Sequence, residues 1–187
     1  MDTAASALKQ PFRTLHTLGP HPTNCEKAGH EWFARQRCHG RVVLHDTLEQ
    51  AVEHVLRDTE SALLACIVYP ALNEIVFQNL HGLSLVDVFI MPTMSMVLAA
   101  RDHDAPCPRS VATHPAPASL IPKGVERVRL ADSNAAAARL CADGEVDGCV
   151  TTIASAQLLG LHILRDFGEV TMGFSIHAPI ATPQGGR

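Results

Sequence analysis

Segments with the pattern of strands alternate along this chain with segments that have the pattern of helices. Short apolar or alternating runs predict strands at residues 13–18, 41–45, 63–69, 85–90, 96–100, 111–113, 125–130, 148–152, 161–164 and 170–177. Apolar positions at helical spacing predict helices at residues 24–36, 48–58, 71–80, 118–121, 134–142 and 154–159. The run at 63–69 is apolar throughout, as expected of a strand buried on both faces of a parallel sheet.

The order of these elements indicates an α/β protein with mainly parallel sheets. Residues 85–100 contain two strand-like segments without a connection of helix length, so the chain can pass there from one small sheet to another. We therefore expect two α/β lobes with a cleft between them, the first from about 11–90 plus 165–180 and the second from about 91–164. Ligands are expected at the carboxyl ends of the strands.

The bulk composition narrows the classes of function. The chain has 187 residues and a formal net charge of −4, and its Lys and Arg residues are scattered, which argues against a nucleic-acid surface. The longest apolar segment, 83–100, is interrupted by Asp87 and Pro92, so no run reaches the roughly 20 residues of a membrane span. Residues 1–10 lack the pattern of a secretory signal. We expect a cytoplasmic, soluble protein whose partner is a small carboxylate substrate, with no nucleic acid and no membrane; a homodimer is left open.

The spacing of cysteine and histidine predicts no metal site. The six cysteines form no C-x-x-C pair, and in a cytosolic protein they are expected to stay reduced. The eleven histidines form no H-x-H, H-x-x-x-H or H-E-x-x-H pattern. We therefore expect neither a metal nor a cofactor.

Three junctions place a small polar residue where a strand is expected to give way to a helix. They are Thr23-Asn24-Cys25, Thr113-His114 ahead of a proline, and Ser133-Asn134 ahead of an alanine run. The start of a helix leaves backbone N–H groups unpaired and carries partial positive charge, so each junction can bind a carboxylate. Several such junctions facing one cleft would form a binding site for a small anion.

Three residues near these junctions are candidates for catalysis. His114 directly follows a strand, and histidine is the usual general acid or base near neutral pH. Cys25 would lie in the first turn of a helix, where the macrodipole lowers the pKa of a thiol. Tyr69, the only tyrosine, follows the third predicted strand, and its phenol can position or protonate a substrate.

The candidates for substrate binding share a polar side chain at an element junction or at the passage between lobes. They are Thr23, Asn24, Asn73, Thr93, Thr113, Ser133, Asn134 and Thr151. Structural roles explain the same residues, since Thr23 and Ser133 are good helix caps and Cys25 and Tyr69 are ordinary core residues. A lone histidine at a turn such as His114 is also commonly structural.

Seven short segments carry motifs that occur together in one group of enzymes. They are residues 17–20, 23, 26–28, 110–120, 132–139, 144–151 and 166–174. The first three match an opening "LGP-x-GT…E-A", and the fourth, which contains T-H-P-A-P, matches an "SHPSP" stretch. The fifth and sixth match "NS-x-x-AAA-x-x-x-x-x-G-x-x-D-x-A-x-T", and the last matches a closing strand. The chain thus resembles prephenate dehydratases and bacilysin-type prephenate decarboxylases over nearly its whole length.

The resemblance implies the type II periplasmic-binding-protein fold, with a substrate held between two lobes. It also implies a single prephenate-dehydratase-like domain over residues 1–187, without the amino-acid-sensing ACT domain into which dehydratases continue.

The sequence departs from the family at three places. Dehydratases carry Thr-Arg-Phe near the closing strand, where the threonine acts in loss of the hydroxyl and the arginine binds carboxylate; this chain has Met172-Gly173-Phe174. Bacilysin-type enzymes carry an arginine in the strand entering the second lobe, where this chain has residues 89–93, F-I-M-P-T. The opening Gly-Thr is replaced by Pro22-Thr23. We therefore do not expect the usual dehydration of prephenate.

Three hypotheses about function follow. The first is a cofactor-independent carbon–oxygen or carbon–carbon lyase, or an isomerase, similar to prephenate dehydratase and decarboxylase, acting on a small cyclic carboxylate in specialised (antibiotic-type) metabolism. The second is an enzyme that incorporates sulfur into a tropolone-type acid, as in a pathway to tropodithietic acid, with Cys25 as the nucleophile or sulfur carrier. The third is a non-catalytic protein that binds a small anion.

Overall fold

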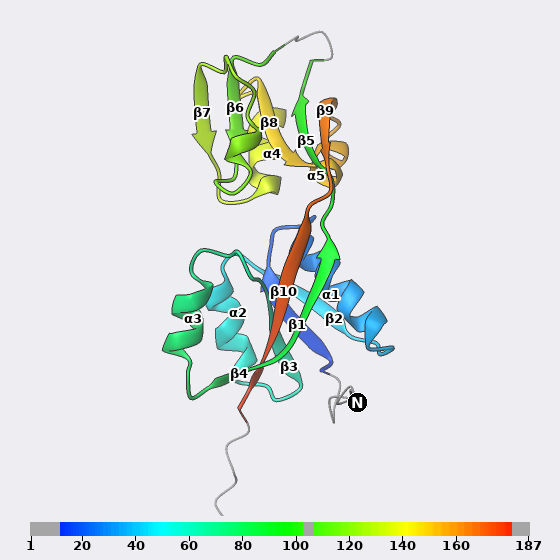
Figure 1. The fold of residues 1–187 in the computed structure, drawn as a ribbon, viewed down its shortest axis with the longest axis vertical. Coiled ribbons are helices and arrows are strands. Elements are labelled where there is room, and N and C mark those ends of the chain that lie inside the picture. Colours follow the sequence, from blue (N-terminus) through cyan, green and yellow to red (C-terminus); the bar gives the residue numbers. More distant parts are fainter. Residues whose placement is uncertain (1–11, 103–106, 181–187) are drawn as a thin grey trace, which may run out of the picture. The chain divides into compact units, whose positions relative to one another are not determined.

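The computed structural model describes residues 12–102 and 107–180. The chain divides into two compact units (Figure 1). The first unit comprises Met1–Leu18, Cys25–Phe89 and Gly173–Arg187, and the second comprises Gly19–Asn24 and Ile90–Met172.

The first unit is built on a sheet with the strand order β2-β1-β3-β10-β4. The strands are β1 (Thr14–Leu18), β2 (Arg41–His45), β3 (Ser61–Cys66), β4 (Leu83–Pro92) and β10 (Thr171–Pro179). β1 runs parallel to β2 and β3, whereas β10 runs antiparallel to β3. The helices are α1 (Asn24–Arg35), α2 (Leu48–Val55) and α3 (Leu72–Gln78). The apolar stripe of α2 packs with β3 and α3 in one buried cluster that includes Val55, Leu63 and Ile75.

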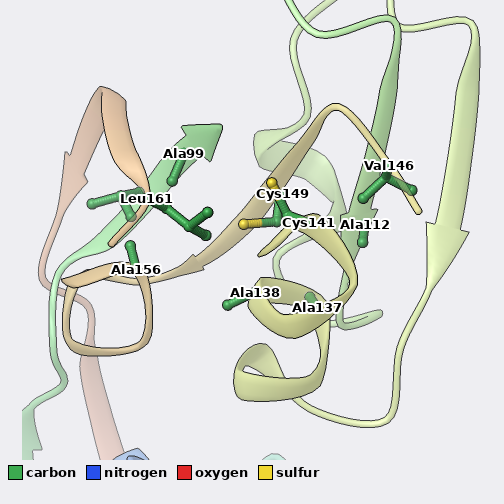
Figure 2. Packing of buried hydrophobic residues seen from close by; sticks show 10 residues of the cluster. Ala99, Ala112, Ala137, Ala138, Cys141, Val146, Cys149, Ala156 and Leu161 are labelled. Atoms are coloured by element: carbon green, nitrogen blue, oxygen red, sulfur yellow. The ribbon is translucent and has the colours of Figure 1, made fainter. Parts of the chain in front are cut away.

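The second unit is built on a sheet with the order β7-β6-β8-β5-β9. Its strands are β5 (Met96–Ala100), β6 (Ser110–Thr113), β7 (Arg127–Leu130), β8 (Gly148–Thr152) and β9 (His162–Gly168). Its helices are α4 (Asn134–Ala142), α5 (Ile153–Leu158) and the short 3-10 helix η1 (Ala118–Leu120). β6 runs parallel to β7 and β8, and β5 runs antiparallel to β8 and β9. Small side chains, alanine above all, fill the core between α4, α5 and this sheet (Figure 2).

The predicted α/β class is confirmed, and the sheets prove to be mixed rather than mainly parallel. Each sheet has three strands that run parallel to one another. In the first sheet β10 pairs antiparallel with β3, and in the second sheet β5 pairs antiparallel with both β8 and β9. Residues 165–172, which we expected in the first lobe, lie in the second unit because Arg165 and Asp166 of β9 pair with Leu98 and Val97 of β5. An apolar run reveals a buried strand, but it carries no information about the direction of its neighbour.

One further predicted boundary shifts. β3 ends at Cys66, so Tyr69 lies in the turn that precedes α3 rather than on a strand.

None of the helices in residues 12–102 and 107–180 is long and apolar enough to span a lipid bilayer.

Three histidines of the first unit stack against one another. Nδ1 of the buried His16 on β1 lies 2.8 Å from Nε2 of His45 on β2, and the ring of His54 on α2 lies 5.5 Å from that of His16 and 4.8 Å from that of His45. Burial, reinforced by the two neighbouring imidazoles and by Arg41, lowers the pKa of His16 to about 4, although Asp58 opposes this shift. Burial and His54 also lower the pKa of His45. Burial therefore keeps His16 and His45 mainly neutral near neutral pH.

Acid is expected to destabilise the first unit through His16. In the unfolded chain the pKa of His16 returns to 6.5, so the unfolded state binds protons more tightly than the folded state between that pH and about 4. The stabilising contribution is complete above pH 6.5 and is lost as the pH falls toward 4. Between about pH 7 and about pH 4.5, the free energy of unfolding of the wild-type protein should fall by about 2 kcal/mol more than that of His16→Gln.

Urea unfolding at both pH values measures this difference. His81→Gln, at an exposed histidine of the same unit, is the matched control and should behave like the wild type. An equal loss of stability in the wild-type protein and in His16→Gln would show that the folded protein does not lower the pKa of His16.

Candidate functional site

The carboxyl ends of three parallel strands meet at one edge of the second sheet. Thr113, the last residue of β6, pairs with Leu130, the last residue of β7, and with Val150 near the end of β8. The residues that follow each strand are therefore brought to the same edge. These are His114 after β6, the residues that lead from β7 into α4, and Thr151 on β8. We call Thr113, His114, Asp132, Ser133, Asn134 and Thr151 the strand-end cluster.

Helix α4 begins within this cluster. Ser133 has extended backbone angles, with φ −154° and ψ 163°, and its Oγ accepts a hydrogen bond from the N–H of Ala136 at 3.0 Å. This is the geometry of a helix N-cap, and it explains why helix formation starts at Asn134. The cap satisfies one of the four N–H groups of the first turn, so the amides of Asn134 and Ala135 still point out of the end of the helix. That end also carries the positive pole of the α4 dipole.

Asn134 is connected to β8 through its backbone. The Oγ1 of the fully buried Thr151 donates a hydrogen bond of 2.6 Å to the carbonyl oxygen of Asn134. The side-chain Oδ1 of Asn134 is buried and has no hydrogen-bond partner among the described residues. Leaving a buried polar atom unsatisfied costs about 1–3 kcal/mol, so such atoms are rare and are often found where a ligand binds.

His114 is the titratable ring of the strand-end cluster. The Oγ1 of Thr113 donates to the carbonyl oxygen of His114 at 3.0 Å, and Nδ1 of His114 accepts from the N–H of Ala116 at 3.2 Å. Since Nδ1 is an acceptor, the neutral ring carries its proton on Nε2. Burial lowers the pKa of His114, while the Asp132 carboxylate opposes this shift. His114 is therefore neutral near pH 7 and becomes a stronger acid than an ordinary histidine once protonated.

Asp132 influences the pKa of His114, although the sequence alone did not single it out as a candidate. In the sequence it stands out only as part of the family motif at residues 132–139. Its position directly ahead of the Ser133 cap could also have marked it as a candidate. Its effect on His114 depends on the register of β6 and β7, which the sequence does not reveal.

The threonines of the cluster hold the backbone in place. The side chains of Thr113 and Thr151 are fully buried, and each donates to a carbonyl oxygen of the chain. Thr93 is also buried and bonds within the second unit, because the N–H of Val170 donates to Thr93 Oγ1 at 3.1 Å and Thr93 N–H donates to the Val170 carbonyl at 2.9 Å. These three predicted binding residues are better described as positioning residues.

Asn24 has a comparable role near the start of α1. Its Oδ1 accepts a hydrogen bond of 2.8 Å from the backbone N–H of Met94, and both residues belong to the second unit. Thr23, the residue before it, belongs to the same unit. The predicted junction at 23–25 is therefore divided between the units, with Thr23 and Asn24 in the second unit and Cys25 in the first.

The remaining candidates, Cys25, Tyr69 and Asn73, lie in the first unit. The prediction that the thiol of Cys25 has a lowered pKa is wrong. Burial and the neighbouring Cys66 raise this pKa to about 12. Desolvation of a thiolate outweighs the favourable helix dipole here. Burial and Glu49 raise the pKa of Tyr69, whose hydroxyl interacts with Glu49 and with the backbone of Leu48. Asn73 is exposed on α3.

Metal ligation was also assessed from the geometry. Among the described residues, no group of three or more His, Cys, Asp or Glu side chains is arranged to hold a metal ion. The chemistry available at the strand-end cluster is anion binding by amides together with proton transfer by His114.

The chain is similar in sequence to curated prephenate decarboxylases. It is 27% identical over 175 residues to the prephenate decarboxylase of Bacillus subtilis, an alignment that covers 87% of this chain and 85% of that protein. No model of a known protein family matches the chain. The resemblance inferred from short motifs is therefore confirmed by a comparison over most of both chains.

Solved structures establish the fold. The prephenate dehydratase of Arthrobacter aurescens, solved in complex with L-Phe, matches with a TM-score of 0.66 at 18% identity, covering 93% of this chain and 63% of that chain. A structure described as the quorum-quenching acylase GqqA matches with a TM-score of 0.62 at 19% identity, covering 93% of this chain and 67% of that chain. The chain thus spans less than two thirds of the length of the Arthrobacter dehydratase. At these identities the likeness concerns the fold alone.

The hydrogen bond between Thr151 and Asn134 is expected to stabilise the second unit. Thr151→Val keeps the shape of the side chain but removes the hydrogen bond that its hydroxyl donates to the carbonyl oxygen of Asn134, so the free energy of unfolding should fall by about 1 kcal/mol. Thr151→Ser retains the hydroxyl and is the matched control. Guanidinium unfolding measures both, and equal stabilities for the two variants would mean that this bond contributes nothing.

Proposed function

We propose that this protein is an enzyme that acts on prephenate or a closely related cyclic carboxylate, as a lyase similar to prephenate decarboxylase. The proposal is supported by 27% identity over 87% of the chain to a prephenate decarboxylase and by the likeness in fold to a prephenate dehydratase. The single observation that carries it is the strand-end cluster, where a capped helix start lies beside a half-buried histidine. Specialised metabolism, including a tropolone-type pathway, is the setting we propose for it.

In this proposal the start of α4 binds a substrate carboxylate. The amides of Asn134 and Ala135 offer two donors that the Ser133 cap does not use, and the helix dipole adds about half a positive charge at that end. The Asn134 side chain, whose Oδ1 has no partner in the described structure, can bond a neighbouring hydroxyl of the substrate. Binding by neutral groups suits a site where the family's arginines are replaced.

His114 is the proposed proton donor. Loss of carbon dioxide breaks the bond between the ring carbon and its carboxylate, and the electron pair enters the ring, which must then gain a proton on carbon. Protonation of His114 at Nδ1 displaces the Ala116 N–H, after which the imidazolium can deliver its Nε2 proton, and the lowered pKa makes it a stronger acid. The Asp132 carboxylate opposes that lowering of the pKa.

The packing of β10 favours decarboxylation over dehydration. Gly173 occupies the position that matches the arginine of the dehydratase motif, and a Cβ built there would lie 2.4 Å from Cδ1 of Ile67. Phe174 is fully buried, with its ring 5.7 Å from that of Phe89. A longer side chain on this part of β10 would therefore have to displace the half-exposed Ile67, and the threonine that assists loss of the hydroxyl is also replaced, by Met172.

The product of the reaction tests the proposal. Purified protein incubated with prephenate should release carbon dioxide and yield a non-aromatic product that keeps the ring hydroxyl, with no phenylpyruvate. Carbon dioxide capture and mass spectrometry of the product measure this outcome. Formation of phenylpyruvate would indicate dehydration, and binding of prephenate without any turnover would indicate a non-catalytic binding protein; either result would contradict the proposal.

Two variants should separate binding from proton transfer. Asn134→Ala should raise KM about 10-fold with a smaller change in kcat, because it removes a contact made in the ground state. His114→Gln should lower kcat about 100-fold or more, because it removes the proton donor. His39→Gln, at an exposed histidine of the first unit, is the control and should leave both constants unchanged. Wild-type kcat in His114→Gln would eliminate this histidine as the donor.

A further inference from the structure

Two cysteines of the second unit lie in contact inside its core. Cys141 is in the last turn of α4 and Cys149 is the second residue of β8, and neither side chain is accessible to solvent. Figure 2 shows their sulfur atoms side by side, and the two thiols form a hydrogen bond with each other. The strand-end cluster does not include either residue.

The connection between α4 and β8 brings the two cysteines together. The chain turns at Gly144, whose φ of +82° suits glycine and disfavours other residues, and re-enters the sheet at Gly148. At Gly148 a Cβ would lie 2.8 Å from Cγ of Pro108, so the strand can pass there only without a side chain. Side chains that already touch, from a helix and a strand that pack together, are close to the separation that a disulfide requires.

The surroundings make the two sulfurs chemically different. The hydrogen bond from Cys149 lowers the pKa of Cys141 and Arg101 lowers it further, although burial and Asp147 oppose this shift. Arg101 lies over the end of α4, since a Cβ at Gly144 would be 2.8 Å from its Nη1. The same contact and burial raise the pKa of Cys149. Cys141 is thus the better nucleophile and Cys149 the thiol that can react with it afterwards.

We propose that Cys141 and Cys149 form an oxidation site that closes to an intramolecular disulfide when the protein meets hydrogen peroxide. The Cys141 thiolate attacks one oxygen of the peroxide, the O–O bond breaks, and the departing hydroxide takes up a proton to give water and a sulfenic acid on Cys141. The Cys149 sulfur then attacks the Cys141 sulfur, the S–S bond forms, and the hydroxide leaves as water with the thiol proton. Two thiols and one peroxide give one disulfide and two waters.

The size of the oxidant matters because the pair is buried. Hydrogen peroxide is little larger than water and can reach the core during local opening, whereas bulky thiol reagents cannot. The exposed Cys107 differs in both accessibility and surroundings, and Cys25, with its pKa near 12, lacks an available thiolate. Oxidation by peroxide should therefore select the Cys141 and Cys149 pair over the other buried cysteines.

Peptide mapping tests the proposal directly. The chain has no Lys or Arg between Arg139 and Arg165, so trypsin places both cysteines in the single peptide 140–165. The protein carrying Cys107→Ser is treated with peroxide, unfolded and alkylated. We expect peptide 140–165 to lack both alkyl groups and two hydrogen atoms, and further cleavage after Glu145 should leave its halves joined until a reductant is added.

Matched variants define the role of each sulfur. Cys149→Ala should leave a sulfenic acid on Cys141 that dimedone traps when the protein is unfolded in its presence, and Cys25→Ala should form the disulfide as before. Mapping of the Cys107→Ser protein alone decides the question if Cys149→Ala fails to fold. Recovery of peptide 140–165 with both cysteines alkylated, or with each oxidised separately to sulfinic acid, would overturn the proposal.

Discussion

The arrangement of the second unit depends on the hydrogen bond that joins the start of α4 to the end of β8. The hydroxyl of Thr151 donates to the carbonyl oxygen of Asn134 at 2.6 Å inside the core, where water cannot compete. This bond fixes the first residue of the helix against the strand. Because β6 and β8 are parallel neighbours, the same contact places the amides of α4 at the edge where His114 follows β6. A single buried hydroxyl thereby fixes the position of the first turn of α4 against β8.

Burial, more than local charge, decides the titration of the candidate residues. Cys25 lies at the positive end of a helix, yet its thiol is held neutral because the side chain is desolvated. His16 and His114 are shifted in the direction that burial dictates for a base, and the carboxylates of Asp58 and Asp132 only moderate the effect. The chemistry open to each group therefore follows from how deeply the fold places it.

The two ends of helix α4 belong to two different groups of residues, the strand-end cluster and the buried pair of thiols. Its alanines allow the helix to approach the sheet closely, since Ala137 and Ala138 are fully buried against the same cluster as Cys149. Close approach brings the first turn to the polar strand ends and the last turn to the buried thiol pair (Figure 2). A disulfide between Cys141 and Cys149 would link α4 to β8 covalently. Oxidation would thus also constrain the helix whose first turn belongs to the strand-end cluster.

The sequence by itself determined the α/β class, the order of elements and the helix start at Ser133, because these follow from local periodicity and capping. The resemblance to prephenate decarboxylases could also be recognised from the sequence, because it rests on short motifs of neighbouring residues. Only the tertiary structure decided the direction of β5, β9 and β10, the influence of Asp132 on His114, the unreactive state of Cys25 and the contact of Cys141 with Cys149. Each of these depends on residues brought together by strand register or buried by packing, and neither register nor depth is encoded in a short stretch of residues.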